Sequence, residues 1–200
     1  MSGDGRDGPP DLADRRGAGT TVYGPAEDSG LLAAAAAEAV GAGDRVLEVG
    51  VGSGWVAERV ADATGATVVG SDVNPHACRR ARERGIETVR ADLVGPFRDG
   101  AFDAVLFNPP YLPADPDAAW DDWMEAALSG GESGRAVVAP FIDDVGRVLA
   151  PGGRVLLVVS SLTGFDAVVE RAERRGFAAR TVREESYPFE TLSVLCLSRG

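Results

Sequence analysis

Short runs of aliphatic residues alternate along the chain with longer stretches whose apolar positions recur at helical spacing. Strands are expected at Arg45–Val49, Thr67–Ser71, Ile86–Arg90, Phe102–Phe107, Arg154–Ser160, Ala179–Arg183 and Thr191–Leu197. Helices are expected at Ala26–Val40, Gly54–Thr64, Asn74–Gly85, Gly134–Leu149 and Phe165–Arg175. This alternation predicts a parallel sheet with right-handed crossover connections.

The last two expected strands break the alternation. Only Glu184–Glu190 separates them, which is too short for a helical crossover, so these two strands should pair antiparallel. The sequence therefore predicts an α/β fold with a mostly parallel seven-stranded sheet whose last strand is antiparallel. This layout resembles the Rossmann-like fold of class I S-adenosylmethionine methyltransferases.

The first residues of the chain differ in composition from the rest. Residues 1–20 are rich in Gly, Asp, Arg and Pro, so we expect a disordered tail followed by one methyltransferase domain over residues 21–200. The tail has no apolar signal core, and no apolar run is long enough to span a bilayer. We therefore expect a cytoplasmic protein. The two cysteines, Cys78 and Cys196, have no metal-ligand spacing and predict reduced thiols and no metal site.

A glycine-rich loop follows the first expected strand. Glu48 lies two residues before Gly50, and Gly52 and Gly54 complete a G-x-G-x-G pattern at the start of a helix. A dinucleotide loop would need its third glycine at position 55, where this chain has Trp55. S-adenosylmethionine has no phosphate, and the carboxylate of Glu48 suits its ammonium group. Taken alone, the loop is equally compatible with a tight structural turn.

Two further acids follow the next two strands. Asp72 lies 22 residues after Gly50, a spacing that suits a carboxylate accepting from both ribose hydroxyls. A helix-capping role is the alternative for Asp72, but Asn74 is better placed for that role. Asp92 follows the third strand and could accept from an adenine amino group while Leu93 packs against the ring. Three acids after successive strands favour a nucleoside-type cofactor.

The fourth strand runs into Asn108-Pro109-Pro110-Tyr111. Prolines fix φ and lack an N–H, which predicts a rigid, extended loop. The side-chain oxygen of Asn108 and the carbonyl of Pro109 could together accept both hydrogens of one NH₂ group. Such a group is a poor nucleophile, and two acceptors would orient its lone pair and stabilise the developing positive charge. Tyr111 could stack on a planar substrate group.

The charge balance is strongly acidic. The net charge is −11, and all 20 basic residues are arginine. An acidic sequence without lysine suggests a halophilic source, although GC-rich codon usage also favours arginine over lysine. A strongly acidic chain is a poor generic binder of phosphate backbones, which disfavours nucleic acid as a partner.

These motifs together resemble the HemK family of protein-glutamine methyltransferases, from about Thr20 to the C-terminus. Residues 22–29, VYGPAEDS, resemble an N-terminal family segment, which implies that Tyr23 and Ser29 belong to the cofactor site. Residues 130–135 and 191–195 resemble two further family stretches. Glu48, Gly50, Asp72, Asp92, Leu93 and Asn108 match family positions for cofactor and substrate. The resemblance departs at Gly24, where a Glu is usual, and at Leu128-Ser129, where a Trp is expected.

The short N-terminal segment is similar to that of the compact archaeal and eukaryotic branch of the family. That branch implies methylation of the glutamine in the Gly-Gly-Gln motif of class I release factors. It also implies a small zinc-binding activator subunit, paired along the edge strand Ile86–Arg90. The acidic run Asp115–Glu125 is either a substrate lid or a solvated insertion.

Three other functions stay open at this point. An adenine N6-methyltransferase acting on RNA or DNA would share the chemistry of the Asn108 loop, but the chain has no clustered basic surface. A protein-lysine methyltransferase must first remove a proton from its substrate, for which Asn108 is poorly suited. A non-catalytic subunit with this fold would not need Glu48, Asp72 and Asn108.

Overall fold

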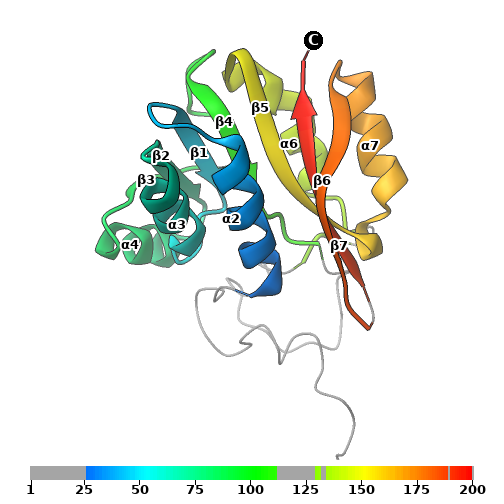
Figure 1. Ribbon diagram of the computed structural model, residues 1–200, viewed down its shortest axis with the longest axis horizontal. Coiled ribbons are helices and arrows are strands. Elements are labelled where there is room, and N and C mark those ends of the chain that lie inside the picture. Colours follow the sequence, from blue (N-terminus) through cyan, green and yellow to red (C-terminus); the bar gives the residue numbers. More distant parts are fainter. Residues whose placement is uncertain (1–25, 112–128, 132–133, 189, 200) are drawn as a thin grey trace, which may run out of the picture.

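The computed structural model describes residues 26–111, 129–131, 134–188 and 190–199. One seven-stranded sheet runs through it in the order β3-β2-β1-β4-β5-β7-β6 (Figure 1). The strands are β1 (Arg45–Val49), β2 (Thr67–Asp72), β3 (Glu87–Arg90), β4 (Phe102–Phe107), β5 (Leu149–Ser160), β6 (Ala178–Ser186) and β7 (Thr191–Ser198). The pairs from β3 to β5 are parallel, and β7 runs antiparallel to both β5 and β6. The predicted fold class and reversed last strand are confirmed.

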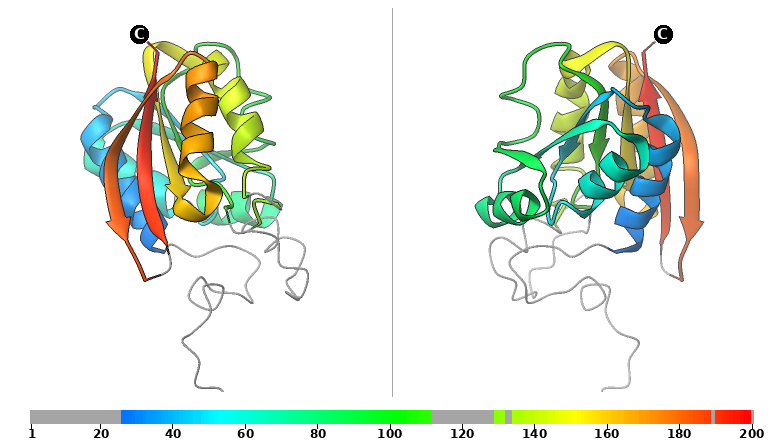
Figure 2. Two further views of the ribbon diagram at one scale, coloured as in Figure 1. Left: turned by 90° about the vertical axis from the view of Figure 1, so that its right-hand side faces the viewer. Right: turned by 60° about the vertical axis from the view of Figure 1, so that its left-hand side comes forward.

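Helices cover both faces of the sheet (Figure 2). They are α2 (Glu27–Ala39), α3 (Trp55–Thr64), α4 (Pro75–Glu83), α6 (Val138–Val148) and α7 (Phe165–Arg174), with a 3-10 turn η1 (Ser161–Thr163) after β5. Alternate residues of β1 divide between two core clusters. Val46 packs with the helices α2 and α3, whereas Leu47 and Val49 pack with α6 and α7. The site at the end of β1 therefore stands on a strand that is buried from both sides.

Three predicted element boundaries were wrong, and one of them is the end of β6, which lies at Ser186 rather than Arg183. β5 begins at Leu149 rather than Arg154, because Leu149 pairs with Phe102 and the register then shifts before Ala104 pairs with Arg154. The Pro151-Gly152-Gly153 turn therefore bulges from within the strand instead of preceding it. The helix expected from Gly134 begins only at Val138. The preceding residues form a turn in which the Ala136 N–H donates to the Gly130 carbonyl.

Several predictions fall on parts of the chain that the structure does not describe. The disordered tail over residues 1–20, the cofactor residue Tyr23 and the Asp115–Glu125 segment lie outside the described residues. Within the described ranges, every helix is too short or too polar to cross a membrane.

Gly54 lets α3 and α4 approach each other closely. Its φ is +78°, and a Cβ there would lie 2.9 Å from Cα of Ala81 in α4. We expect Gly54→Ala to lower the free energy of unfolding by about 3 kcal/mol, because backbone strain and overpacking add. Gly65 is the matched control, since its φ is +73° but its nearest neighbour would be Ala42 Cβ at 3.7 Å. Gly65→Ala should cost only about 1 kcal/mol in urea denaturation. Equal losses for the two variants would contradict the packing role of Gly54.

Candidate functional site

The candidate site lies where β1, β2 and β4 end side by side. Val49 pairs with Ser71 of β2 and with Phe107 of β4, so the residues that follow these strands meet at one edge of the sheet. A Cβ on Gly50 would lie 3.5 Å from the ring of Phe107, which places the glycine loop against the start of the Asn108 loop. The fold thus brings together the first two predicted acids and Asn108, at the edge where α/β sheets bind ligands.

The glycine loop is held against β2. Gly50, Gly52 and Gly54 have φ values of +65°, +52° and +78°, which residues with a Cβ rarely adopt. Val51 between them is buried, and its N–H donates to the Ser71 carbonyl at 2.9 Å. Its side chain fills the space above Gly70, where a Cβ would come within 2.6 Å of it. The loop is therefore preorganised. Gly54 at its end is needed for close packing against Ala81 of α4.

Glu48 is a buried acid at the end of β1. It is 4 % exposed, and the Ala57 N–H in the first turn of α3 donates to its carboxyl group. Among the described residues its Oε2 atom has no hydrogen-bond partner. Burial, and to a lesser degree the charge of Asp72, raise the pKa of Glu48 to about 8, against the opposing effect of the Ala57 bond. Such a carboxyl group fits the ammonium of S-adenosylmethionine, whose charge would favour the ionised form.

This raised pKa makes the stability of the protein depend on pH. Between about pH 4.5, the ordinary pKa, and about pH 8, the folded chain keeps a proton on Glu48 that the unfolded chain has lost. Stability from this group is therefore complete below pH 4.5 and is lost as the pH rises to 8. Glu48→Gln cannot titrate and should remove this loss, which amounts to up to roughly 5 kcal/mol. Denaturant unfolding of wild type and of Glu48→Gln at pH 4.5 and at pH 8 measures this loss. If the free energies of unfolding of the two proteins differ by the same amount at both pH values, the raised pKa is contradicted.

Asp72 fixes the glycine loop and the start of α4. Its carboxyl oxygens accept from the Gly52 N–H at 3.0 Å and from the Asn74 N–H at 2.9 Å. Burial raises the pKa of Asp72, and these backbone bonds oppose the rise. Asn74 caps α4 by accepting from the His76 N–H at 2.8 Å, as predicted. A carboxylate has about four acceptor positions, so Asp72 can still accept from ligand hydroxyls.

The third acid lies beyond the end of its strand. β3 ends at Arg90, and Asp92 is exposed in the loop that follows. The Ala91 N–H donates to the Asp72 carbonyl at 3.0 Å, so this loop begins beside the second acid. Leu93 has a φ of +48°, the one positive value for a non-glycine residue in the described part of the chain. The geometry thus places Asp92 and Leu93 near Asp72, while their contact with a ligand stays a prediction.

The Asn108 loop carries a buried acceptor. Within the described residues, the side-chain oxygen of Asn108 is buried and has no hydrogen-bond donor. Pro109 is buried as well. The ring of Tyr111 packs in the core cluster on the α2 side and is 3 % exposed. Its stacking on a substrate stays a prediction, as does the catalytic role of Pro109.

Sequence reasoning missed the role of Asp28. The Tyr111 hydroxyl donates to Asp28 Oδ2 at 3.2 Å, and Asp28 is 2 % exposed in the first turn of α2. Ser29, a predicted cofactor residue, donates to Asp28 Oδ1 from its N–H at 2.6 Å. Asp28 therefore ties the Asn108 loop to the helix that carries Ser29. An acid in the first turn of an apolar, alanine-rich helix was the available signal.

The glycine stretch after the undescribed segment closes against the Asn108 loop. A Cβ on Gly134 would lie 2.8 Å from the Tyr111 carbonyl and 3.4 Å from Cα of Thr163. Arg135 donates to the Thr163 carbonyl at 2.5 Å, which links this stretch to η1 at the end of β5. In the described ranges, no three His, Cys, Asp or Glu side chains gather as a metal site.

Known proteins with similar sequence and structure were found by three comparisons. Residues 46–131 match a family model described as a methyltransferase domain. A Methanocaldococcus jannaschii protein described as a putative protein N5-glutamine methyltransferase is 36% identical, covering 87% of this chain and 90% of its own. Methyltransferase HEMK2 of Homo sapiens is 35% identical, covering 92% of this chain and 93% of its own.

A solved structure is also similar over almost the whole chain. It is the E. cuniculi Mtq2–Trm112 complex, described as responsible for the methylation of the eRF1 translation termination factor. The TM-score is 0.76 at 29% identity, and the match covers 90% of this chain and 100% of the other. The chain therefore belongs to the HemK family of protein-glutamine methyltransferases, which use S-adenosylmethionine as methyl donor.

Proposed function

We propose that the chain methylates the side-chain amide nitrogen of the glutamine in the Gly-Gly-Gln motif of a class I peptide-chain release factor. The observation that carries the proposal is the buried side-chain oxygen of Asn108, which has no donor among the described residues. A buried acceptor without a donor is costly, so its presence at the end of β4 indicates that a ligand N–H completes it. The names of the similar proteins support an amide nitrogen as that ligand.

The proposed chemistry needs no ionisable base. Asn108 Oδ1 and the Pro109 carbonyl accept the two hydrogens of the glutamine NH₂ group and direct its lone pair out of the amide plane. As the nitrogen gains positive charge, both acceptors stabilise it more strongly, which lowers the barrier rather than only improving binding. Bound S-adenosylmethionine would supply the methyl group and leave as S-adenosylhomocysteine, and the methylated nitrogen would then release one of its two protons to water. The bond from Tyr111 to Asp28 holds the loop in place.

The cofactor would lie across the ends of β1, β2 and β3. Glu48 would hold the ammonium group, Asp72 the ribose hydroxyls, and Asp92 with Leu93 the adenine. The cofactor would come closest to the backbone at Gly50 and Gly52, which have no side chain. The predicted cofactor residues are Tyr23, Ser29, Glu48, Gly50, Gly52, Gly54, Asp72, Asp92, Leu93 and Asn108.

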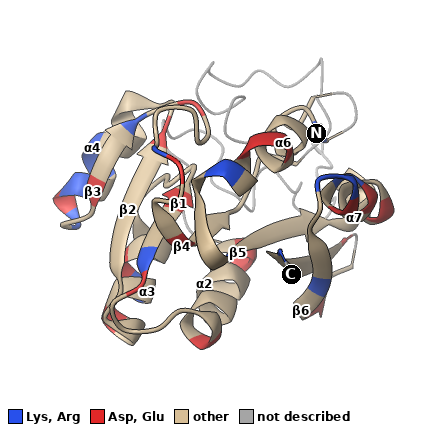
Figure 3. Cartoon of the chain, turned by 90° about the horizontal axis from the view of Figure 1, so that it is seen from above, with Lys and Arg blue, Asp and Glu red and all other residues tan. Residues whose placement is uncertain are grey.

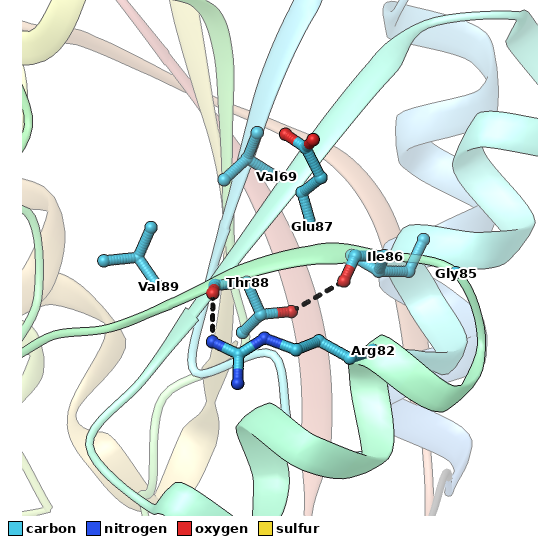
Figure 4. A pocket seen from close by; sticks show the side chains of 7 residues that line it. All are labelled: Val69, Arg82, Gly85, Ile86, Glu87, Thr88 and Val89. Atoms are coloured by element: carbon cyan, nitrogen blue, oxygen red, sulfur yellow. Dashed lines mark hydrogen bonds between the residues drawn. The ribbon is translucent and has the colours of Figure 1, made fainter.

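The proposed activator surface is the outer edge of β3. A shallow hollow of about 490 Å³ runs along this strand and is lined by residues that include Arg82, Ile86 and Val89 (Figure 4). Val89 is 40% exposed, and Val73 beside it in the loop after β2 is 42% exposed. An edge strand with exposed apolar side chains favours pairing with another chain. A small zinc-binding activator subunit is the partner that we propose for it.

Val89→Asp tests this surface. A charge buried in the interface should weaken the complex with the zinc-binding subunit by about tenfold or more, because no opposite charge offsets the cost of removing it from water. Thr181→Asp on β6, the opposite edge of the sheet, is the matched control and should leave the affinity unchanged. Titration calorimetry of both variants measures the effect. If the chain alone binds cofactor and turns over as fast as with the subunit, the proposed role of the activator is wrong.

Nucleic acid is disfavoured as the substrate. The arginines of α4 and of its C-cap form the most basic stretch of the fold (Figure 3), and three of these four have a partner within the chain. Arg79 contacts His76, Arg82 donates to the Thr88 carbonyl, and Arg84 pairs with Glu58. These three guanidinium groups are therefore already engaged with separate partners, which disfavours a shared surface for phosphates.

The experiment compares methyl transfer to the release factor with transfer to RNA and DNA. The acidic, lysine-free composition supports a halophilic source, so the assay is run at high salt, with and without the activator. A release factor acts with ribosomes, which supports a cytoplasmic location. We expect methyl transfer to the release factor and none to RNA or DNA. Transfer to nucleic acid alone, abolished by Asn108→Ala, would instead establish an adenine N6-methyltransferase.

A further inference from the structure

The loop between β3 and β4, residues 91–101, contains no helix. Its internal backbone bonds are long: the Gly95 N–H donates to the Asp92 carbonyl at 3.4 Å, and the Phe97 N–H to the Val94 carbonyl at 3.2 Å. Leu93 is held in the left-handed region, which a side chain with a Cβ disfavours. Such a conformation persists only when the surroundings fix it. Contacts from outside the loop must therefore hold it.

Arg147 of α6 provides most of these contacts. Its guanidinium donates to three carbonyl oxygens of the loop, those of Val94 at 3.1 Å, Gly95 at 3.4 Å and Phe97 at 2.6 Å. It also pairs with Asp99 at 2.8 Å, and its own carbonyl accepts from the Gly100 N–H at 3.0 Å. One side chain thus contacts the β3–β4 loop along most of its length. The planar fork of an arginine suits several carbonyls at once, whereas a lysine ammonium is a single point charge.

The Arg147 side chain is itself oriented within α6. Its Nε and Nη2 atoms donate to the carboxylate of Asp144, one turn earlier, at 3.3 and 3.4 Å. Val94, the residue after Leu93, is fully buried in the core cluster on the α6 side. The loop is therefore pinned immediately after Leu93, by packing at Val94 and by hydrogen bonds to the guanidinium.

We propose that Arg147 is a positioning residue for the adenine end of the cofactor site. By fixing the carbonyls of Val94 and Gly95, it holds Leu93 in its left-handed conformation and sets the direction of the Asp92 carboxylate. This inference rests on the proposed function, in which Asp92 accepts from the adenine amino group. Arg147 does not touch the cofactor and acts through the loop.

The test measures recognition of the adenine amino group. S-adenosylhomocysteine and S-inosylhomocysteine differ at that group, which is a carbonyl in the second compound. Calorimetry of wild type should show a preference of about tenfold for the adenosyl compound, the equivalent of one hydrogen bond to a charged group. In Arg147→Met and in the milder Arg147→Lys, the preference should fall to about twofold, because Asp92 is no longer directed at the base. If Arg147→Met does not fold, the preference is measured on Arg147→Lys alone.

Arg171→Met is the matched control. Arg171 of α7 donates to the Ala139 carbonyl at 3.0 Å and pairs with Asp143, so it supports the same helix layer without contacting the loop. It should lower stability and leave the preference at tenfold. Folded Arg147 variants that keep the wild-type preference would overturn the proposal, as would a wild type that binds both compounds equally. A wild type that binds neither compound, even with the activator, would instead contradict the proposed function.

Discussion

Replacing Asn108 by alanine is expected to lower the rate of methyl transfer by about 100- to 1,000-fold, the usual cost of removing one group that stabilises charge in the transition state. The structure gives the reason, since the buried Oδ1 atom has no donor among the described residues and is left to accept from a substrate. The cofactor affinity should change only a few-fold, because most of the predicted cofactor contacts lie on other strands. Single-turnover kinetics with the release factor separate the two quantities.

Asn108→Asp is the informative companion variant. It keeps an acceptor oxygen of the same size and should retain more activity than the alanine variant. An alanine variant with more than about a tenth of the wild-type rate would contradict the assignment of Asn108 as a group that acts in the transition state.

Replacing Asp72 by alanine is expected to weaken binding of S-adenosylmethionine by about 100-fold, because two hydrogen bonds to a charged acceptor are lost. The same change removes the acceptor for the N–H groups of Gly52 and Asn74 and so loosens the glycine loop. Calorimetric titration with the cofactor measures the loss.

Asp103→Ala is the matched control for Asp72. Asp103 accepts from the Arg45 N–H at 2.9 Å and lies at the start of β4, at the opposite end of the strand from the site. Its removal should leave the affinity for S-adenosylmethionine unchanged. Equal affinities for the Asp72 variant and wild type would remove Asp72 from the cofactor site.

The parts of the fold that depend on local chemistry were predictable from the sequence. Asn74 before Pro75 indicated a helix start, and the structure confirms the cap. The short connection expected at Glu184–Glu190 indicated the reversed last strand, which is confirmed, although β6 extends to Ser186 and the connection is shorter still. The start of β5 was not predictable, because its pairing with Phe102 across a bulge depends on the neighbouring strand rather than on its own proline and glycines.

The contacts that assemble the site were beyond sequence reasoning. Tyr111 and Asp28 are 83 residues apart, and only the packing of α2 against the sheet brings them together. Arg147 reaches the carbonyl of Val94, which is 53 residues away, and backbone acceptors leave no trace in the sequence. That Glu48 Oε2 and Asn108 Oδ1 have no donor among the described residues is likewise visible only in the structure.

The reaction that we propose for this chain is methylation of a glutamine side chain. The most direct measurement is tandem mass spectrometry of the cognate release factor after incubation with the chain, its activator and S-adenosylmethionine. We predict one added methyl group on the glutamine of the Gly-Gly-Gln peptide, absent when Asn108→Ala replaces the wild-type chain. A methyl group on a lysine or on nucleic acid, with the glutamine unmodified, would contradict the account.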